Sequence, residues 1–146
     1  MLRRILVALS LAAVVQTAAA LDYRSVSVPA AVLFDAPSQA AKKLYLIKAQ
    51  TPVEVVVRIE GWSKVRDAEG TLAWIETRNL SEQRTLAVIA PRAEIRSADR
   101  PDAPVLAELD KWVGVELVEP ASPGWVKVRH RDGVTGYMRA TQVWGL

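Results

Sequence analysis

One segment of the chain is written twice, 63 positions apart, and this duplication limits the folds that the chain can adopt. The first copy runs from Trp62 to Ile75 and the second from Trp125 to Met138. Each copy opens with Trp and alternating residues (WSKVR and WVKVR), passes a Gly, and returns on a small residue followed by an aromatic one. Such alternation on both sides of a Gly turn is typical of a β-hairpin. The sequence therefore predicts two similar β modules in tandem.

The residues around the hairpins also favour strands. The run 53–59 (VEVVVRI) is rich in β-branched residues and predicts a buried strand. Apolar segments at 31–34, 42–47 and 93–96 predict further short strands. Eight prolines interrupt the chain, and no long run beyond position 20 follows the period of an amphipathic helix. The predicted fold class is all-β.

A polar stretch, 81–84 (SEQR), separates two blocks of apolar pattern and predicts the boundary between the copies. A repeat of about 60 residues has the size of a small self-contained domain rather than of a solenoid unit. The predicted domains are therefore 21–83 and 84–146. Since a domain of this size buries only about 60% of its unfolded surface, we expect the two to pack on each other.

Outside the hairpins the two copies align less closely. The best match of the sequences places 93–96 opposite 32–35, Leu106 opposite Leu46, and Val113 opposite Val53. This alignment predicts that the loop before Trp125 is three residues longer than its counterpart before Trp62. The tip Asp132-Gly133 is a stronger turn signal than Glu69-Gly70, because Asp-Gly readily adopts positive φ angles.

The first 20 residues have the three parts of an export signal. Arg3 and Arg4 form the charged region, 5–15 the apolar region, and 18–20 (AAA) the small-residue cleavage site. The apolar region is too short to span a bilayer, which needs about 20 residues. We expect cleavage near Ala20 and a periplasmic or secreted protein without a stable membrane anchor.

Composition excludes several classes of protein. The absence of cysteine excludes disulfides, thiolate metal sites and lipid attachment at a cysteine. Loss of Arg3 and Arg4 with the signal leaves 17 Lys and Arg against 16 Asp and Glu, a net charge of +1. Binding to nucleic acid or to anionic lipid is therefore not indicated.

The titratable residues form no recognisable catalytic set. The single histidine, His130, lies beside a hairpin tip and has no cysteine or second histidine for nucleophilic or metal chemistry. It is interpreted as a solvated turn residue. Asp67 and Glu69 lie at the other tip, where solvated carboxylates are expected. We expect no enzymatic activity, no cofactor and no metal.

Strand alternation predicts what each hairpin presents to solvent. If Val126 and Val128 enter the core, then Trp125, Lys127 and Arg129 share the outer face. In the first copy Trp62 is likewise outside with Lys64 and Arg66, and Trp74 and Tyr137 follow on the returning strands. Two aromatics bordered by cations suit a peptide or glycan. The candidate ligand-binding residues are Trp62, Trp74, Trp112, Trp125, Lys127, Arg129 and Tyr137.

These aromatic residues also have a structural interpretation. Trp62 and Trp125 follow a Gly at strand starts, where a bulge or strong twist turns a ring over the end of the sheet, and large aromatics are mostly buried. Trp112 interrupts a polar turn and is the best single candidate for an exposed aromatic; its alternative role is a lid on the interface between modules. Trp144 is expected to pack.

The ordered set of motifs resembles the bacterial SH3-like (SH3b) domain family. In the second copy the resemblance rests on 93–96 (AEIR), 111–115 (KWVGV), 124–129 (GWVKVR) and 133–138 (GVTGYM). It covers 85–146 and, more weakly, 26–81. The first copy departs from the family pattern at Phe34-Asp35, where the family usually has a residue such as Val or Leu followed by Arg. It departs again at Ala73, where the family commonly has Gly. The second copy is therefore the better preserved.

The resemblance implies two small, partly open SH3-like β-barrels. In cell-envelope proteins the family typically serves as a non-catalytic targeting or binding module, often alongside peptidoglycan hydrolases. The expected function is that of an exported tandem SH3b protein that recognises peptidoglycan or a cell-wall peptide or glycan, with the second module as the preferred binder. The alternative is an adaptor that pairs with another envelope protein through the same surface or an exposed sheet edge.

Overall fold

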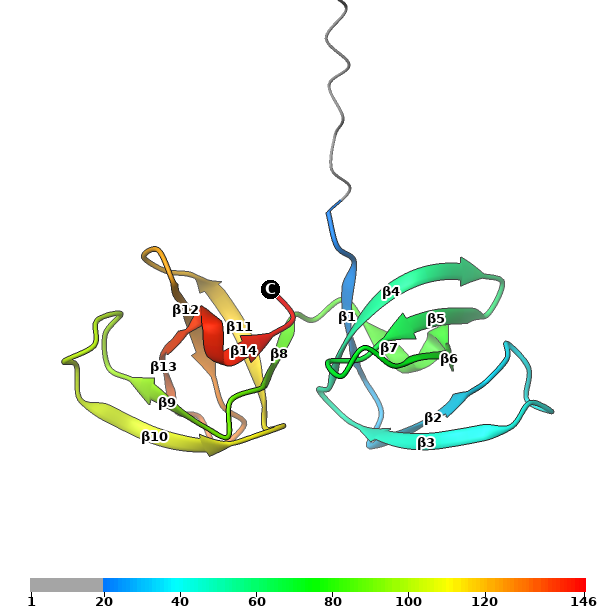
Figure 1. Cartoon of the computed structure of the whole chain (residues 1–146), viewed down its shortest axis with the longest axis horizontal. Coiled ribbons are helices and arrows are strands. Elements are labelled where there is room, and N and C mark those ends of the chain that lie inside the picture. Colours follow the sequence, from blue (N-terminus) through cyan, green and yellow to red (C-terminus); the bar gives the residue numbers. More distant parts are fainter. Residues whose placement is uncertain (1–19) are drawn as a thin grey trace, which may run out of the picture.

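The computed structural model describes residues 20–146, and residues 1–19, which carry the expected export signal, lie outside the described part. Two antiparallel sheets of seven strands, one from each copy, make up the described chain (Figure 1). Apart from strands and loops, residues 20–146 contain only two short helical turns, η1 (Thr77–Asn79) and η2 (Ala140–Gln142). In this part of the chain no helix has the length and apolar character needed to cross a membrane. The all-β prediction is confirmed.

The first sheet, called module 1, begins near the N-terminal end of the described chain. Its strands are β1 (Tyr23–Val26), β2 (Ala30–Phe34), β3 (Lys43–Lys48), β4 (Pro52–Ile59), β5 (Trp62–Arg66), β6 (Leu72–Glu76) and β7 (Leu80–Ser81). The strand order is β3-β2-β6-β5-β4-β1-β7. Because β3 and β7 are the two ends of this order, the sheet is open rather than a closed barrel.

The second sheet, called module 2, repeats this plan. Its strands are β8 (Thr85–Val88), β9 (Arg92–Arg96), β10 (Val105–Asp110), β11 (Gly114–Pro120), β12 (Trp125–Arg129), β13 (Thr135–Arg139) and β14 (Val143–Trp144). The order β10-β9-β13-β12-β11-β8-β14 matches that of module 1 strand by strand. The predicted tandem of similar modules is confirmed.

Strand register shows that the alignment of the two copies from sequence is wrong in β2. Phe34 lies opposite Trp74 on β6. Arg96 lies opposite Tyr137 on β13 in the same way. Arg96 is therefore the counterpart of Phe34, whereas the sequence alignment placed it opposite Asp35. A shift of one residue exchanges the two faces of a strand, so this correction decides which side chains are compared.

The same correction applies to β3 and β4. Glu108 is the counterpart of Leu46, because they lie opposite matching residues of β9 and β2. Val115 is likewise the counterpart of Val53, because Val115 lies opposite Leu86 on β8 and Val53 lies opposite the matching residue of β1, Arg24. Equivalent residues are 62 positions apart through β4 and 63 apart from β5 onward, so the turn before β12 is longer by one residue rather than three. The sequence alignment of Leu106 and Val113 with these positions is wrong.

Each module has its own apolar core built from inward-facing strand residues. Val65, Val126 and Val128 are all buried, as alternation predicts. The buried cluster of module 1 comprises Val26, Ala31, Leu33, Val53, Val55, Val65, Ala73 and Ile75. That of module 2 comprises Leu86, Val88, Ala93, Ile95, Leu109, Val115, Val126, Val128, Met138 and Val143.

The two modules pack on each other through β1 of module 1 and the end strand β14 of module 2. The rings of Tyr23 on β1 and Trp144 on β14 meet edge to face, with centroids 5.2 Å apart. The Arg84 guanidinium lies 5.3 Å from the Tyr23 ring centroid, and its Nη2 donates to the Gly145 carbonyl at 2.5 Å. Burial raises the pKa of the Tyr23 phenol, and the nearby Glu54 carboxylate adds to this effect. Trp144 thus packs as predicted, and the polar stretch between the copies contributes Arg84 to the interface.

Candidate binding surfaces

The outer side of β4, β5 and β6 in module 1 carries exposed apolar and aromatic side chains. Residues that lie opposite each other share a side, and here Val57 lies opposite Lys64, and Ile59 opposite Trp62. Lys64 in turn lies opposite Trp74. Val57 and Ile59 are 44% and 47% exposed, which is high for branched apolar side chains. We call this surface the module 1 face; its members are Val57, Ile59, Trp62, Lys64, Leu72 and Trp74.

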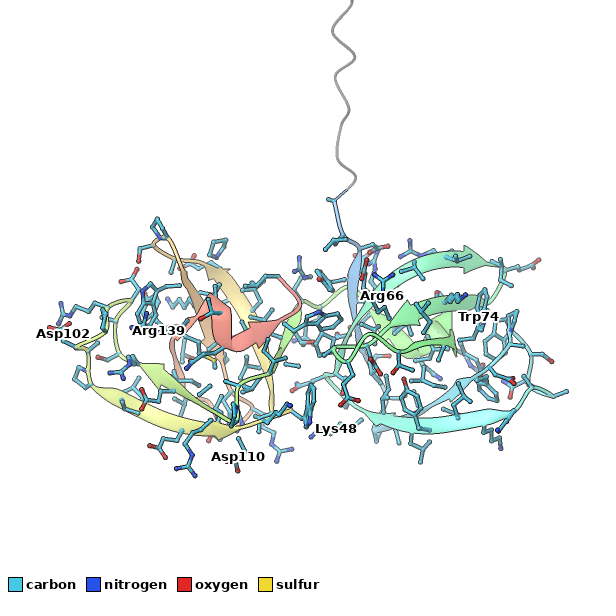
Figure 2. All side chains as sticks on the ribbon, viewed as in Figure 1. Lys48, Arg66, Trp74, Asp102, Asp110 and Arg139 are labelled. Atoms are coloured by element: carbon cyan, nitrogen blue, oxygen red, sulfur yellow. The ribbon has the colours of Figure 1, made fainter. Side chains whose placement is uncertain are left out.

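The module 1 face contains two tryptophans on neighbouring strands, Trp62 on β5 and Trp74 on β6 (Trp74 is labelled in Figure 2). The Trp62 ring packs edge to face against the buried Phe34, with centroids 5.3 Å apart. The Lys64 ammonium lies 6.0 Å from the centroid of the Trp74 ring. Both tryptophans remain partly exposed. Such fixed rings give contact area at small entropic cost, and the cation can orient a carboxylate.

The loop between β2 and β3 is fixed beside this face. At its base the Asp35 N–H donates to the Lys42 carbonyl, and the Lys42 N–H donates to Asp35 Oδ1, both at 3.0 Å. Further along, Gln39 Nε2 donates to Glu76 Oε1 on β6 at 2.5 Å. The loop is therefore tied to β6, the strand that carries Trp74.

The corresponding face of module 2 is charged instead of apolar. Register places Glu119 at the position of Val57, Arg96 at that of Phe34, Thr135 at that of Leu72, and Arg139 at that of Glu76. Two of these replacements remove the exposed apolar side chains Val57 and Leu72 from the face. The two copies therefore keep the same strands but present different chemistry.

Three cations on this face of module 2 are engaged in ion pairs. Lys127 Nζ lies 3.8 Å from Glu119 Oε1, and Arg129 Nη1 lies 3.4 Å from Glu116 Oε2. Arg96 pairs with Glu94. Lys127 and Arg129, predicted from sequence to orient a ligand, thus have carboxylate partners from the module itself.

Trp125 departs from the predicted surface. Its side chain is only 9% exposed, and the Arg139 guanidinium lies 4.8 Å from the ring centroid. Arg139 lies directly opposite Trp125 across the β12–β13 pair, so its side chain covers the ring. The prediction that Trp125 is an open aromatic of the outer face is wrong, and the packing alternative describes it. Tyr137 is half-buried opposite Lys127.

Trp112 occupies the turn between β10 and β11 in a backbone conformation that disfavours large side chains. Its φ is 71°, in the left-handed region, which costs a non-Gly residue about 1–2 kcal/mol. Gln50 at the matching turn of module 1 has a φ of 63°. The Trp112 side chain is 38% exposed, and the Lys111 ammonium lies 4.6 Å from its ring centroid. The exposure predicted for Trp112 is confirmed.

Trp112 also borders a groove of about 390 Å³ between the two modules. On the opposite wall the Tyr45 hydroxyl donates to Asp67 Oδ2 at 2.8 Å. Trp112 is therefore both an exposed aromatic residue and part of the interface between the modules. The remaining walls come from Leu46, Ile47, Lys48, Thr51, Pro52, Ala68, Glu69 and Ala87.

The Tyr45 phenol is held in its protonated form. Burial raises the pKa of Tyr45 well above its usual value, and the hydrogen bond to the Asp67 carboxylate raises it further. The folded state thus retains a proton that the unfolded state loses near pH 10. The stability that Tyr45 contributes is complete below about pH 10 and is lost as pH rises towards the folded-state pKa.

Replacing Tyr45 by phenylalanine should reduce the loss of stability at high pH. At about pH 8 the variant should be less stable than the wild type by about 1 kcal/mol, because it lacks the hydrogen bond to Asp67. Between about pH 8 and about pH 11 its free energy of unfolding should fall less than that of the wild type. Urea unfolding at the two pH values measures both effects. Equal losses in the two proteins would contradict the proposed role of Tyr45.

The two hairpin tips are held by local hydrogen bonds. His130 Nδ1 lies 2.8 Å from Asp132 Oδ1, and its side chain is 16% exposed, less than predicted for a solvated turn residue. This contact lowers the pKa of Asp132. In the other tip, Asp67 Oδ1 accepts the N–H groups of Glu69 and Thr71, each at 2.9 Å. Within residues 20–146, no group of three or more His, Asp or Glu side chains is arranged to hold a metal ion.

The fold and its surfaces define a tandem of small, open SH3-like sheets, a class of binding module. The model of the bacterial SH3 domain matches residues 27–82 and 90–145. The chain therefore belongs to the bacterial SH3 domain family, as the resemblance implied. Domains of this family are cell-wall binding modules.

Three solved structures resemble this chain at low sequence identity. NlpC2 from Trichomonas vaginalis is 14% identical, with 88% of this chain and 49% of that chain covered and a TM-score of 0.40. NlpC1 from the same organism is 14% identical, with 88% and 47% covered and a TM-score of 0.40. An NlpC/P60 family protein from Bacillus cereus is 16% identical, with 84% and 55% covered and a TM-score of 0.39. This chain thus spans about half the length of each. No curated protein is significantly similar to it.

Proposed function

We propose that this chain is an exported, non-catalytic tandem SH3b protein, with modules at 21–83 and 84–146, that binds a peptide or glycan of the cell wall through the module 1 face. The observation that carries the proposal is the exposure of Val57 and Ile59 on the same face as the two tryptophans. Apolar and aromatic surfaces contact sugar rings and peptide side chains, and Lys64 supplies a cation for a carboxylate.

The proposal transfers the main binding role from the second module to the first. The better-preserved motifs of module 2, Gly136 and the Asp132-Gly133 tip, maintain its hairpin rather than an open surface. Its Trp125 ring is covered, and Lys127 and Arg129 have carboxylate partners. Module 2 supports module 1 through the contact of Tyr23 with Trp144.

Co-sedimentation with purified, protein-free peptidoglycan tests this function. The chain should be retained at low salt, and most of the retention should persist at about 0.5 M salt, because apolar contacts are not screened by ions. Retention that vanishes in salt would contradict binding through the module 1 face. No retention at low salt would contradict the proposed function itself.

The free edge of β3 favours a second candidate function, an adaptor for another envelope protein. The Ala49 N–H donates to the Pro29 carbonyl at 3.2 Å, and bonded pairs alternate along an antiparallel ladder. This alternation directs the N–H and C=O of Leu46 away from β2, towards the open side of an end strand. Leu46 is 65% exposed, and an extended segment of a partner protein can add to such an edge. Cross-linking from position 46 in the envelope would give a discrete protein adduct in this case.

A further inference from the structure

One end of the core is polar in module 1 and apolar in module 2. Leu86 and Val126 are 0% and 4% exposed in the core of module 2. Register assigns them Arg24 and Ser63 as counterparts in module 1. Two further polar residues of module 1 have apolar counterparts in module 2. Arg58 stands at the position of Pro120, and Thr77 at that of Ala140. Since module 2 adopts the same strand order without these polar groups, the fold does not require them.

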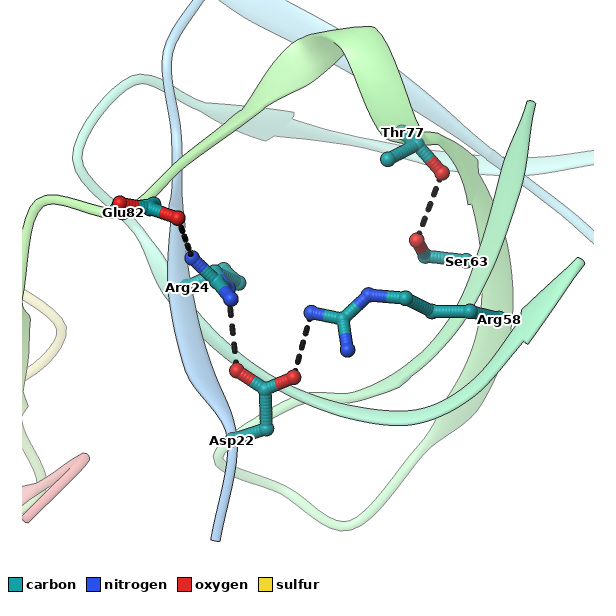
Figure 3. Close-up of polar contacts among 6 residues, drawn as sticks. All are labelled: Asp22, Arg24, Arg58, Ser63, Thr77 and Glu82. Atoms are coloured by element: carbon teal, nitrogen blue, oxygen red, sulfur yellow. Dashed lines mark hydrogen bonds and ion pairs between the residues drawn. The ribbon is translucent and has the colours of Figure 1, made fainter. Parts of the chain in front are cut away.

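The polar residues surround a cavity of about 290 Å³ in module 1. Ser63, which lines it, is 0% exposed, and its Oγ lies 2.8 Å from Thr77 Oγ1 (Figure 3). Ser63 points to the opposite side of β5 from Trp62 and Lys64, so the cavity is separate from the module 1 face. Ser63 thus places a hydroxyl where module 2 has valine, and this hydroxyl is bonded to the partly exposed Thr77, which also lines the cavity.

Two guanidinium groups at this cavity share one carboxylate. Arg24 Nε lies 3.0 Å from Asp22 Oδ1, and Arg58 Nη2 lies 2.5 Å from Asp22 Oδ2 (Figure 3). Arg24 Nη1 also lies 3.1 Å from Glu82 Oε1, although the Glu82 side chain is 91% exposed. A guanidinium has five N–H donors, so these three contacts leave donors on both arginines for a further acceptor.

We infer that this cavity binds the carboxylate of a small ligand, which displaces Glu82 from Arg24. The carboxylate is held by the guanidinium groups of Arg24 and Arg58, the geometry in which arginine recognises carboxylates. The Thr77 hydroxyl, held by its hydrogen bond with Ser63, contacts the group next to it. When Glu82 has left, two arginines and Asp22 carry a net charge of +1, which matches a monoanion. The volume suits the C-terminal residues of a short peptide.

Titration of the full chain with N-acetyl-alanyl-alanine tests this site, because the peptide ends in a free carboxylate. NMR of the arginine Nε–H groups should show saturable shifts for Arg24 and Arg58. The same peptide ending in a carboxamide should bind at least about tenfold more weakly, because it lacks the charge. Equal binding of acid and amide, no shift with the acid, or tighter binding of inorganic phosphate would each overturn the inference.

Module 2 supplies the substitutions for a second test. The variant Arg24→Leu, Ser63→Val carries the residues of module 2 and should lose at least about tenfold in peptide affinity while keeping its stability towards urea. Arg58→Gln should also lower the affinity, and it replaces the double variant in this test if the double variant does not fold.

Glu82→Gln should bind about twofold to fivefold more tightly, since the competing carboxylate is gone. Arg78→Leu, an exposed arginine outside the cavity, is the matched control and should bind as the wild type does. Unchanged affinity in the double variant and in Arg58→Gln would overturn the inference.

Discussion

Replacing Trp62 and Trp74 together by alanine is expected to lower the affinity for purified peptidoglycan by at least about tenfold. The two rings are the aromatic residues of the module 1 face, on which Val57 and Ile59 are also exposed. Truncation of aromatic anchor residues typically costs a binding surface about 2 kcal/mol or more, and about 1.4 kcal/mol corresponds to a factor of ten. Co-sedimentation over a range of peptidoglycan concentrations measures the change.

The matched control for this variant is Tyr137→Ala in module 2. Tyr137 is the counterpart of Trp74, because each lies opposite a lysine of the preceding strand. If the module 1 face is the binding surface, this control should retain most of the wild-type affinity. Because Trp62 also packs against Phe34, urea unfolding must show that the double variant is folded. Loss of binding in Tyr137→Ala with retention in the folded tryptophan variant would place the surface on module 2.

Replacing Gly136 by alanine is expected to destabilise module 2 by about 3 kcal/mol, the upper part of the usual cost of overpacking. A Cβ at Gly136 would lie 2.4 Å from the Arg96 carbonyl oxygen and 2.7 Å from Ile95 Cγ2. The first of these contacts is with backbone, so β9 and β13 would have to separate. The matching residue of module 1 is Ala73, which is buried and carries the methyl group without a change of fold.

Urea unfolding followed by tryptophan fluorescence measures this effect. The control is Ala73→Gly, which should cost about 0.5–1 kcal/mol because glycine gains more freedom in the unfolded chain. A loss below about 0.5 kcal/mol in Gly136→Ala would show that β9 and β13 adapt to the methyl group without strain. The variant also weakens module 2 selectively. Peptidoglycan binding that persists in it, at temperatures where module 1 stays folded, would support the module 1 face.

Local pattern was sufficient to predict the fold. The hairpins that begin at Trp62 and Trp125 and the inward valines follow directly from strand alternation and Gly turns. The covering of Trp125 could not be predicted in this way, because it depends on Arg139 across the strand pair. An alternating pattern shows on which side a residue lies, but it does not show what covers that residue.

The sequence was least informative about which residues of the two modules correspond to each other. From sequence alone, Arg24 and Ser63 are ordinary polar residues of alternating strands. Only the register places them opposite the positions that Leu86 and Val126 occupy in the other core. The groove beside Trp112 could not be predicted from sequence either, because residues of both modules line it and no local sequence pattern shows how the modules pack.

The unequal cores of the two modules have a consequence for how such a duplicated chain can evolve. Module 2 has ten residues in its buried apolar cluster and module 1 has eight, the difference including the positions of Arg24 and Ser63. A domain of this size is marginally stable, and polar groups at core positions lower its stability further. Docking through Tyr23 and Trp144 lets the intact copy compensate for that loss. Duplication thus permits a division of labour in which one copy maintains the fold and the other is free to acquire chemistry.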